Sequence, residues 1–327
     1  MVRSEGNSRW LSKKAKSLAV HDSMVTMIYH RTAVIVLNWN GLKDTVECLE
    51  SLRRITYPDY QVLVVDNGST GDDAKVLRER FGDYIHIIEN ERNYGFAEGN
   101  NIGMRYALAK LDPGYLLLLN NDITVEPNFL TELVIAAESD ARVGLLGPLI
   151  YDYYKPNVVR GTGHGQRISW WRGTTIGIMS RKLKDRTRGM LEADCIEGSC
   201  MLIPRRVLEE VGMLDQEYFA YWEETDWCVR IRAADYKVCC VLGSKIWHKV
   251  QPFSANSNKL YYFLRNNILF MRKNADKRHL GFFLIYFFCV SLPLWCLKPF
   301  LAHPLGTIRA VAKALLWNIG HQPMKCQ

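Results

Sequence analysis

The sequence predicts an α/β fold with an open, mostly parallel sheet covered by helices on both faces. Short apolar runs rich in β-branched residues or leucine alternate with segments whose apolar residues recur at helical spacing. Each apolar run also ends in polar or turn-forming residues, as buried strands do where they leave a sheet. An order of strand, helix, strand, helix is typical of a parallel sheet with two covered faces.

The predicted elements follow one another closely in the first half of the chain. Strands are predicted in the runs 32–41, 60–66, 85–90 and 115–122, and helices between them at 44–55, 74–82 and 100–111. Glycine-rich and basic residues in 151–191 predict an irregular loop. Order returns with strands at 200–203 and 236–242 and helices at 204–212 and 224–234.

Composition and charge fit a globular chain with two basic ends. Hydrophobic residues make up 48% of the 327 residues, and the net charge is +8. Residues 265–327 contain nine basic side chains and one acidic one, whereas the middle of the chain is mildly acidic. Basic ends suggest an anionic surface, and the acidic middle offers no basic groove for nucleic acid. We therefore predict a membrane partner and no nucleic-acid partner; the sequence predicts no oligomeric state.

The cysteines and the N-terminus indicate a cytosolic protein. Nine cysteines show neither a CxxC pair nor a zinc-type spacing, which predicts reduced thiols. Residues 1–31 are polar and dotted with lysine and arginine, and they contain no apolar stretch of signal-peptide type. We expect this segment to be a disordered or amphipathic lead-in.

One apolar segment near the C-terminus suggests contact with a membrane. Eighteen uncharged residues run from Leu280 to Leu297, and Pro293 would kink a helix formed by them. A buried helix, an interfacial helix and a membrane span all remain open on length alone. Flanking basic residues and the aromatic content favour an interfacial or re-entrant anchor within 273–327.

Polar side chains gather where the predicted strands end. Asn38, Asp66 and Asp122 all follow apolar runs, and open α/β sheets bind ligands outside the carboxyl ends of their strands. The sequence contains no G-x-G-x-x-G after its first strand and no P-loop, so a dinucleotide or P-loop site loses its main support. We predict one crevice that collects these three side chains.

The segment Asn120–Asp122 is the first candidate for chemistry. Oxygen-rich side chains at a strand end suit a hard divalent cation that also binds phosphate oxygens. An Asx turn that ends the strand is the structural alternative. The neighbourhood of Asp66 favours the metal site.

Three carboxylates within four residues form the second candidate. Glu223, Glu224 and Asp226 lie at a predicted helix start, where the helix dipole stabilises negative charge without any function. Alternatively, one of them is a general base whose pKa its neighbours raise. Surrounding aromatic residues, Trp222 among them, provide a surface on which sugar rings stack.

Four further polar residues stand out. His248 follows a strand, and a lone histidine is more often structural than a metal ligand. Arg265 would usually belong to a solvated helix face. Asn93 and Asn100 lie in a glycine-containing segment whose backbone can approach a ligand closely.

Taken together, these motifs resemble the inverting family 2 glycosyltransferases of the GT-A fold, especially the rhamnosyltransferase-like branch. The resemblance covers about residues 32–272 and rests on "VIVLNWNG", "VVDNGSTGDD", "NERNYGFAEGNNIG", "LLLLNNDITVEP", "EGSCMLIPRRVLEEVGMLDQEYFAYWEETDWCVR", "WHKV" and "YYFLRNN". It implies a nucleotide-binding half at 32–125 and an acceptor and catalytic half at 126–272.

The resemblance also implies roles for individual residues. The residues expected to bind the nucleotide or the substrate are Asn38, Asp66, Arg92, Asn93, Asn100, Asn120, Asn121, Trp222 and Arg265. Asp122 and His248 are expected to hold Mn²⁺ or Mg²⁺ at the diphosphate. Glu224 is the expected base, and Glu223 and Asp226 match the acids beside it.

The implied reaction moves a sugar, with inversion, from a dTDP- or UDP-linked donor to a hydroxyl of a cell-surface glycan or lipid-linked acceptor. Cytoplasmic donors and a membrane-bound acceptor predict a peripheral or monotopic enzyme on the cytoplasmic face of the membrane. The alternatives are a noncatalytic glycan-binding protein tethered to the membrane, or a nucleotidyltransferase. The paired carboxylates at strand ends count against the first, and the missing basic, glycine-rich loop after strand one counts against the second.

Overall fold

The protein is described by a computed structural model that covers residues 30–160, 164–178, 189–249 and 257–323. All of the elements below belong to the compact unit Arg31–Gln327. The predicted lead-in at 1–31 lies outside the described residues, except for its last two. Parts of the predicted loop at 151–191 lie outside them as well.

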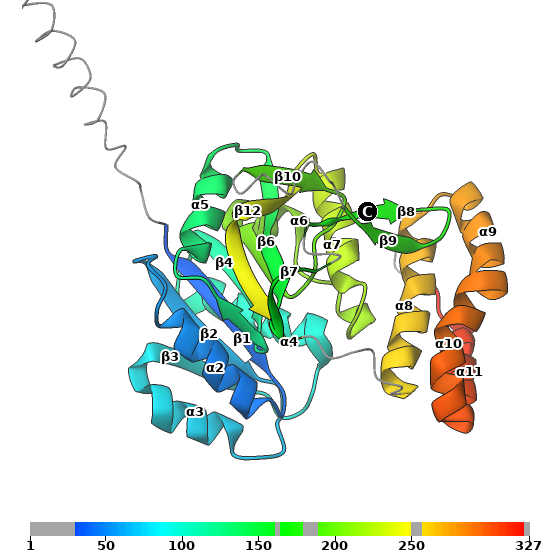
Figure 1. Cartoon of the computed structure of the whole chain (residues 1–327), viewed down its shortest axis with the longest axis horizontal. Coiled ribbons are helices and arrows are strands. Elements are labelled where there is room, and N and C mark those ends of the chain that lie inside the picture. Colours follow the sequence, from blue (N-terminus) through cyan, green and yellow to red (C-terminus); the bar gives the residue numbers. More distant parts are fainter. Residues whose placement is uncertain (1–29, 161–163, 179–188, 250–256, 324–327) are drawn as a thin grey trace, which may run out of the picture. The chain divides into compact units, whose positions relative to one another are not determined.

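A ten-stranded sheet forms the centre of the unit (Figure 1). Its main path runs in the order β10-β12-β6-β11-β4-β1-β2-β3, with β5 paired to β12 and β7 paired to β6. The strands are β1 (Thr32–Asn38), β2 (Tyr60–Asp66), β3 (Ile85–Glu89), β4 (Tyr115–Asn120), β5 (Ile123–Val125), β6 (Val143–Asp152), β7 (Lys155–Val159), β10 (Met190–Ala193), β11 (Cys200–Pro204) and β12 (Lys237–His248). A separate hairpin consists of β8 (Gln166–Ser169) and β9 (Thr174–Gly177).

The predicted fold class is confirmed, with one refinement in the second half. β1 pairs in parallel with β2 and β4, and β2 pairs in parallel with β3. β11 then lies antiparallel between β4 and β6, so the complete sheet is mixed. The carboxyl ends of β1, β2 and β4 meet at one edge, because Asn38 is in register with Asp66 and Leu37 with Asn120.

Helices cover both faces of the sheet. They are α2 (Leu42–Leu52), α3 (Asp73–Phe81), α4 (Gly95–Lys110), α5 (Phe129–Glu138), α6 (Arg205–Val211) and α7 (Glu223–Ala233), with 3-10 turns η1 (Gly82–Tyr84) and η3 (Gln216–Tyr218). Alternate residues of β1 serve opposite faces, as strand geometry requires. Ala33 and Ile35 pack in the core that contains α4 and α7, whereas Val34 and Val36 pack with α2 and α5.

The prediction of an irregular loop at 151–191 is wrong for much of the part that the structure describes. β6 continues to Asp152, and β7, β8, β9 and the start of β10 occupy segments that the sequence does not mark as strands. These strands are four or five residues long and partly exposed, so they show no clear alternation of apolar and polar residues.

The C-terminal part consists of helices that pack on one another. α8 (Ser257–Asn274) is followed by α9 (Lys277–Tyr286), a π-helical turn η4 (Phe287–Ser291), α10 (Leu292–Ala302) and α11 (Pro304–Gly320). Lys277–Ala302 forms one 26-residue helix, and among the described residues it alone is long and apolar enough to cross a membrane. The π turn directly precedes Pro293, which has no backbone N–H to donate to a preceding turn.

This long helix has one packed side and one exposed side. Phe283 and Phe287 are fully buried, whereas Phe282 and Ile285 are 59% and 67% exposed. α11 turns back after Ala302 and packs along α8. The C-terminal segment is therefore joined to the sheet domain through α8 over much of its length.

Candidate active site

Asn38 and Asp66 form the centre of the strand-end site. The Asn38 amide donates to Asp66 Oδ1 at 2.8 Å and to Asp73 Oδ2 at 3.0 Å, and its oxygen accepts from Thr45 at 2.7 Å. Asn38 is completely buried and Asp66 nearly so. The backbone N–H of Ser69 donates to the second Asp66 oxygen at 3.3 Å. Asn38 therefore fixes the Asp66 carboxylate and keeps little hydrogen-bonding capacity for a ligand.

The loops after β2 and β3 touch beside this centre. Asn67 donates to Asn93 Oδ1 at 3.0 Å and to the carbonyl of Gly95 at 3.0 Å. Gly68 has φ +75°, and a Cβ there would lie 2.5 Å from the backbone of Arg92. The Arg92 guanidinium is exposed and lies 5.0 Å from the centre of the Tyr94 ring, where it can meet a ligand.

Asn120, the last residue of β4, and the two residues that follow it make different contacts. Asn121 donates back to Thr45 Oγ1 at 2.9 Å and so fastens the β4 end to the loop after β1. The backbone N–H of Asn120 donates to Ser199 at 2.9 Å. Asp122 instead faces β12, with its Oδ1 3.1 Å from His248 Nε2. Of these three side chains, that of Asp122 contacts another ionisable group, the His248 ring.

His248 lies between two carboxylates. Its Nδ1 is 3.0 Å from Glu197 Oε1, and its Nε2 faces Asp122. Burial alone would lower the pKa of His248, but the two carboxylates outweigh burial and raise it to about 9. Sequence analysis missed Glu197 as a site residue, although it is the first residue of the "EGSC" motif.

The donor atoms of Asp122 and His248 fit an octahedral cation. Ligand atoms about 2.1 Å from Mg²⁺ lie roughly 3.0 Å apart along an octahedral edge. The 3.1 Å between Asp122 Oδ1 and His248 Nε2 matches this edge. Asp122 Oδ1 is also buried without a well-aligned hydrogen bond, and Glu197 behind Nδ1 orients the ring as second carboxylates do at metal sites. Within the described ranges no group of three or more His, Cys, Asp or Glu is placed to hold a metal ion.

A strained loop precedes the carboxylates of α7. Phe219, Tyr221 and Trp222 have φ values of +63°, +71° and +77°. Each non-glycine residue in this region costs about 1–3 kcal/mol and persists only where its surroundings hold it. Residues 217–222, which we call the 217–222 loop, must therefore be held by other elements.

Two side chains of α8 hold the 217–222 loop. Asn266 is fully buried, and its amide nitrogen lies 2.7, 2.7 and 2.9 Å from the carbonyl oxygens of Tyr218, Ala220 and Tyr221. Arg265 donates to the carbonyls of Glu217 and Tyr218, each at 2.7 Å. The Arg265 guanidinium is thus engaged by the loop, and the structure does not bring it to the strand-end site.

The start of α4 holds the loop from the other side. The backbone N–H groups of Phe96 and Ala97 donate to the carbonyl of Phe219 at 2.6 and 3.2 Å. Gly95 has φ +83°, and a Cβ there would lie 2.5 Å from the same oxygen. Asn100 is buried and donates to the carbonyl of Phe96 at 2.9 Å, so it braces this helix turn. The loop that leads to α7 therefore rests on the segment that follows Asn93.

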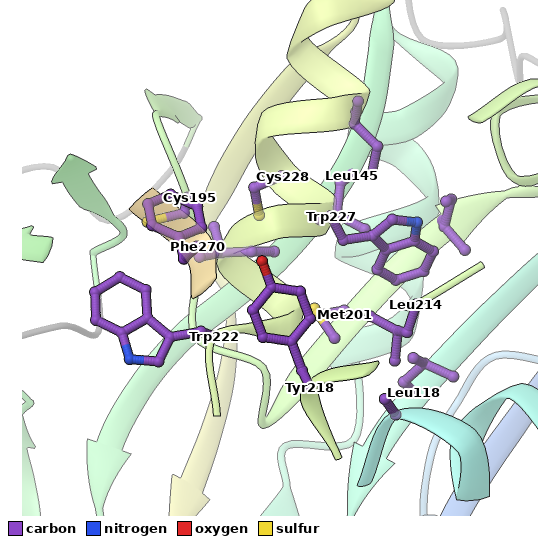
Figure 2. Close-up of a cluster of buried hydrophobic side chains, with 14 of the residues drawn as sticks. Leu118, Leu145, Cys195, Met201, Leu214, Tyr218, Trp222, Trp227, Cys228 and Phe270 are labelled. Atoms are coloured by element: carbon purple, nitrogen blue, oxygen red, sulfur yellow. The ribbon is translucent and has the colours of Figure 1, made fainter. Parts of the chain in front are cut away.

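Of the three α7 carboxylates, only Glu224 lines a cavity. Asp226 is fully buried, accepts from Tyr218 at 3.0 Å and pairs with Arg230 at 2.9 Å (Figure 2 shows Tyr218 between Trp222 and Trp227). Glu223 is 4% exposed, and its Oε2 has no hydrogen-bond partner among the described residues. Glu224 is half-buried beside a cavity of about 300 Å³.

Burial is the main cause of a raised pKa for both Glu223 and Glu224. The negative charge of Glu224 further raises the pKa of Glu223, and that of Glu197 further raises the pKa of Glu224. A hydrogen bond from Thr225 partly lowers the pKa of Glu224. Gly198 packs closely against Glu224: a Cβ added to Gly198 would lie only 3.1 Å from Glu224 Cβ. Residues 197–198 therefore join the Asp122–His248 pair to Glu224.

The similarity to known proteins identifies the chain as a glycosyltransferase with the GT-A fold. The sequence pattern of glycosyl transferase family 2 matches residues 33–212, more than half of the chain. The chain belongs to glycosyl transferase family 2, and the resemblance seen in the sequence is confirmed.

Curated relatives cover most of this chain. The low-salt glycan biosynthesis hexosyltransferase Agl10 of Haloferax volcanii is 27% identical over 72% of this chain and 74% of its own. The dTDP-rhamnosyl transferase RfbF of Shigella flexneri is 25% identical over 74% of this chain and 80% of its own. The N-acetylglucosaminyl-diphospho-decaprenol L-rhamnosyltransferase of Mycobacterium tuberculosis is 27% identical, with 61% and 70% covered.

Solved structures share the fold at low sequence identity. GalNAc-T7 with UDP, GalNAc and Mn²⁺ matches with a TM-score of 0.60 and 16% identity, over 81% of this chain and 57% of that chain. Residues 1–349 of S. aureus TarS with UDP-GlcNAc match with a TM-score of 0.57 and 13% identity, over 87% and 80% of the two chains. Such similarity shows the fold alone.

Replacing Asn266 should loosen the 217–222 loop. In Asn266→Ala the carbonyls of Tyr218, Ala220 and Tyr221 lose the Asn266 donor, while Arg265 still donates to that of Tyr218. This loss should cost about 1–3 kcal/mol of unfolding free energy. Hydrogen exchange of the loop amides should accelerate more than exchange elsewhere. The exposed Asn157→Ala variant is the control and should change neither measurement. Unchanged loop exchange in Asn266→Ala would show that the loop does not need this clamp.

Glu223 should make stability depend on pH. Its pKa is raised above the ordinary value of 4.5, so the stability it contributes is fully present below about pH 4.5 and is lost as pH rises through the raised pKa. Glu223→Gln should therefore raise the Tm more at pH 8 than at pH 5. The exposed Glu79→Gln variant should show no such difference. An equal Tm change at both pH values contradicts a buried, destabilising charge.

Proposed function

We propose that this enzyme transfers a sugar, with inversion, from a nucleotide diphosphate sugar to a hydroxyl of a cell-surface glycan or lipid-linked acceptor. One observation carries the proposal: Glu224, the α7 carboxylate at the cavity, is joined through residues 197–198 to the Asp122–His248 pair. The proposed base and the proposed diphosphate site thus lie on either side of residues 197–198. We assign donor binding to 32–125, acceptor binding and catalysis to 126–272, and membrane attachment to 273–327.

The donor would bind across the carboxyl ends of β1, β2 and β4. Asp66, fixed by Asn38, would accept hydrogen bonds from the base or ribose, and the exposed Arg92 would approach from the next loop. A dTDP- or UDP-linked sugar is the proposed donor. The names of RfbF, a dTDP-rhamnosyl transferase, and of TarS bound to UDP-GlcNAc support this assignment.

Asp122 and His248 would hold Mn²⁺ or Mg²⁺. Their 3.1 Å separation and the Glu197 carboxylate behind His248 fit a divalent cation with oxygen and imidazole ligands. When bound, the cation would neutralise charge on the departing diphosphate. Solved GT-A structures such as GalNAc-T7 contain Mn²⁺, which supports the same assignment.

Glu224 would act as the base in a single displacement. The acceptor oxygen forms a bond to the anomeric carbon, the bond from that carbon to the diphosphate oxygen breaks, and the acceptor proton moves to Glu224. Attack opposite the leaving group inverts the configuration. Burial raises the pKa of Glu224, which makes its carboxylate a stronger base than an exposed one.

The long C-terminal helix would hold the enzyme on the cytoplasmic face of the membrane as a monotopic or peripheral protein. One of its sides is packed and the other exposes large apolar residues. Lys277, Arg278 and Lys298 are exposed at or near its ends, where anionic headgroups would meet them. Because its packed side rests on helices joined to the sheet domain, we favour lying on the membrane over crossing it.

Nucleotide binding should depend on Asp122 and on metal. At about 100 times its Kd, UDP or dTDP with Mn²⁺ should add roughly 2.7 kcal/mol to the stability of the wild type. Asp122→Asn should lose the part that depends on Mn²⁺, whereas the exposed Asp83→Asn control should keep it. If no nucleotide stabilises the wild type in thermal-shift titrations, a noncatalytic glycan-binding protein becomes the better account.

Removing the base should separate catalysis from donor binding. Glu224→Gln should lower kcat by about 10²–10⁴-fold and leave the Kd of the nucleotide unchanged. In the wild type, kcat should rise with pH as Glu224 ionises, with its midpoint above the ordinary carboxylate range because its pKa is raised. A Glu224→Gln enzyme with nearly full kcat would exclude this residue as the base.

A further inference from the structure

The cavity beside Glu224 is built from both the catalytic half and the C-terminal helices. Its lining residues come from β9, the 217–222 loop, the start of α7, α8 and α10: Thr174, Thr175, Tyr221, Trp222, Glu224, Thr225, Phe263 and Trp295. The long apolar helix therefore contributes Trp295 to a wall that faces the proposed base. A helix that served only as an anchor would have no need to reach this cavity.

An aromatic series leads from the cavity to the exposed side of that helix. Ring centres are 6.1 Å apart for Trp222 and Phe263, and 4.8 Å apart for Phe263 and Trp295. The series continues from Trp295 to Phe287 at 6.2 Å and from Phe287 to Phe288 at 5.3 Å. Phe288 is 47% exposed but Phe287 is fully buried, so the rings form continuous packing between the cavity and the outer surface of the helix, not an open channel.

The outer surface has the character of a lipid-facing one. Large apolar side chains are exposed on both arms of the α10–α11 hairpin: Leu294, Leu297, Phe300, Leu301, Leu305, Ile308, Leu316 and Ile319. The exposed Arg309 and Lys313 make no ion pair with any described residue. Apolar residues interspersed with unpaired basic ones fit an anionic bilayer surface better than they fit a folded protein partner.

The size and polarity of the cavity limit what it can hold. About 300 Å³ is at the lower end for small-molecule sites, enough for one sugar ring but not for a sugar chain with its lipid. Trp222 is 6% exposed, and its indole N–H has no acceptor among the described residues.

We propose that this cavity is the acceptor site, and that the acceptor is a membrane lipid that carries a single sugar ring. The inference rests on the proposed function and adds the acceptor class and its binding residues. The ring occupies the cavity with one hydroxyl at Glu224, and the lipid leaves past Trp295 toward the exposed apolar side of α10 and the bilayer. Phe263 and Trp295 stack against the ring or the first part of the lipid.

Binding of matched probes tests this inference without relying on turnover. N-acetylglucosamine linked to farnesyl diphosphate is compared with methyl N-acetylglucosaminide by titration calorimetry, on the full chain with UDP and Mn²⁺ present. The farnesyl probe should bind about tenfold more tightly than the methyl glycoside. A short-chain glucosyl diacylglycerol is the third probe. Trp295-dependent binding of either lipid probe supports the inference and names the lipid class.

Trp295 of α10 provides the variant, and an exposed apolar residue of α5 provides the control. Trp295→Ala should weaken binding of the lipid probe about tenfold, and Trp295→Phe should restore most of its affinity. Ile135→Ala removes an exposed side chain that neither lines the cavity nor belongs to the C-terminal helices, and it should leave probe affinity nearly unchanged. Equal effects of the two alanine variants, or equal affinity for the methyl glycoside, would overturn the inference.

The nucleotide titration distinguishes a failure of the proposed transferase function from a failure of the proposed acceptor site. UDP affinity should be the same in the wild type, Trp295→Ala and Ile135→Ala, which also shows that the variants are folded. If the wild type binds no nucleotide, the transferase function fails. The lipid probes, titrated without nucleotide, then still decide whether the cavity is a Trp295-dependent glycolipid site.

Discussion

The structure depends on one set of hydrogen bonds, those from Arg265 and Asn266 of α8 to the carbonyls of the 217–222 loop. Three residues of that loop have left-handed backbone conformations that would relax without these donors. The loop ends where α7 begins, so its shape sets the position of Glu224. The start of α4 holds the same loop through Phe219, which links the proposed base to the proposed donor half of the enzyme.

The C-terminal helices reinforce the same clamp. Asn318 of α11 donates to the carbonyl of Arg265 at 3.0 Å, and the Arg265 guanidinium lies 4.5 Å from the centre of the Trp317 ring. Arg272 of α8 donates to the carbonyl of His321 at 2.9 Å. The helices proposed to meet the membrane and the loop that holds the base are therefore parts of one packed structure. Truncation before α9 should disturb catalysis as well as membrane attachment.

Local patterns predict the fold and the strand-end residues well, because strand period and turn residues are properties of short segments. Partners distant in the sequence decide the rest. Asp226 resembles a catalytic acid in sequence, yet Tyr218, Arg230 and Asn274 occupy its oxygens. The function of Glu197 depends on His248, 51 residues later, and no spacing rule reveals that contact.

The anomeric configuration of the first product tests the central claim most directly, because a single base at Glu224 allows only one displacement. Proton NMR can follow the sugar released or transferred from the nucleotide donor before its anomers equilibrate. The account predicts that this first product has the configuration opposite to that of the donor. A first product with the donor's own configuration would require two displacements, and it would contradict the assignment of Glu224 as the base.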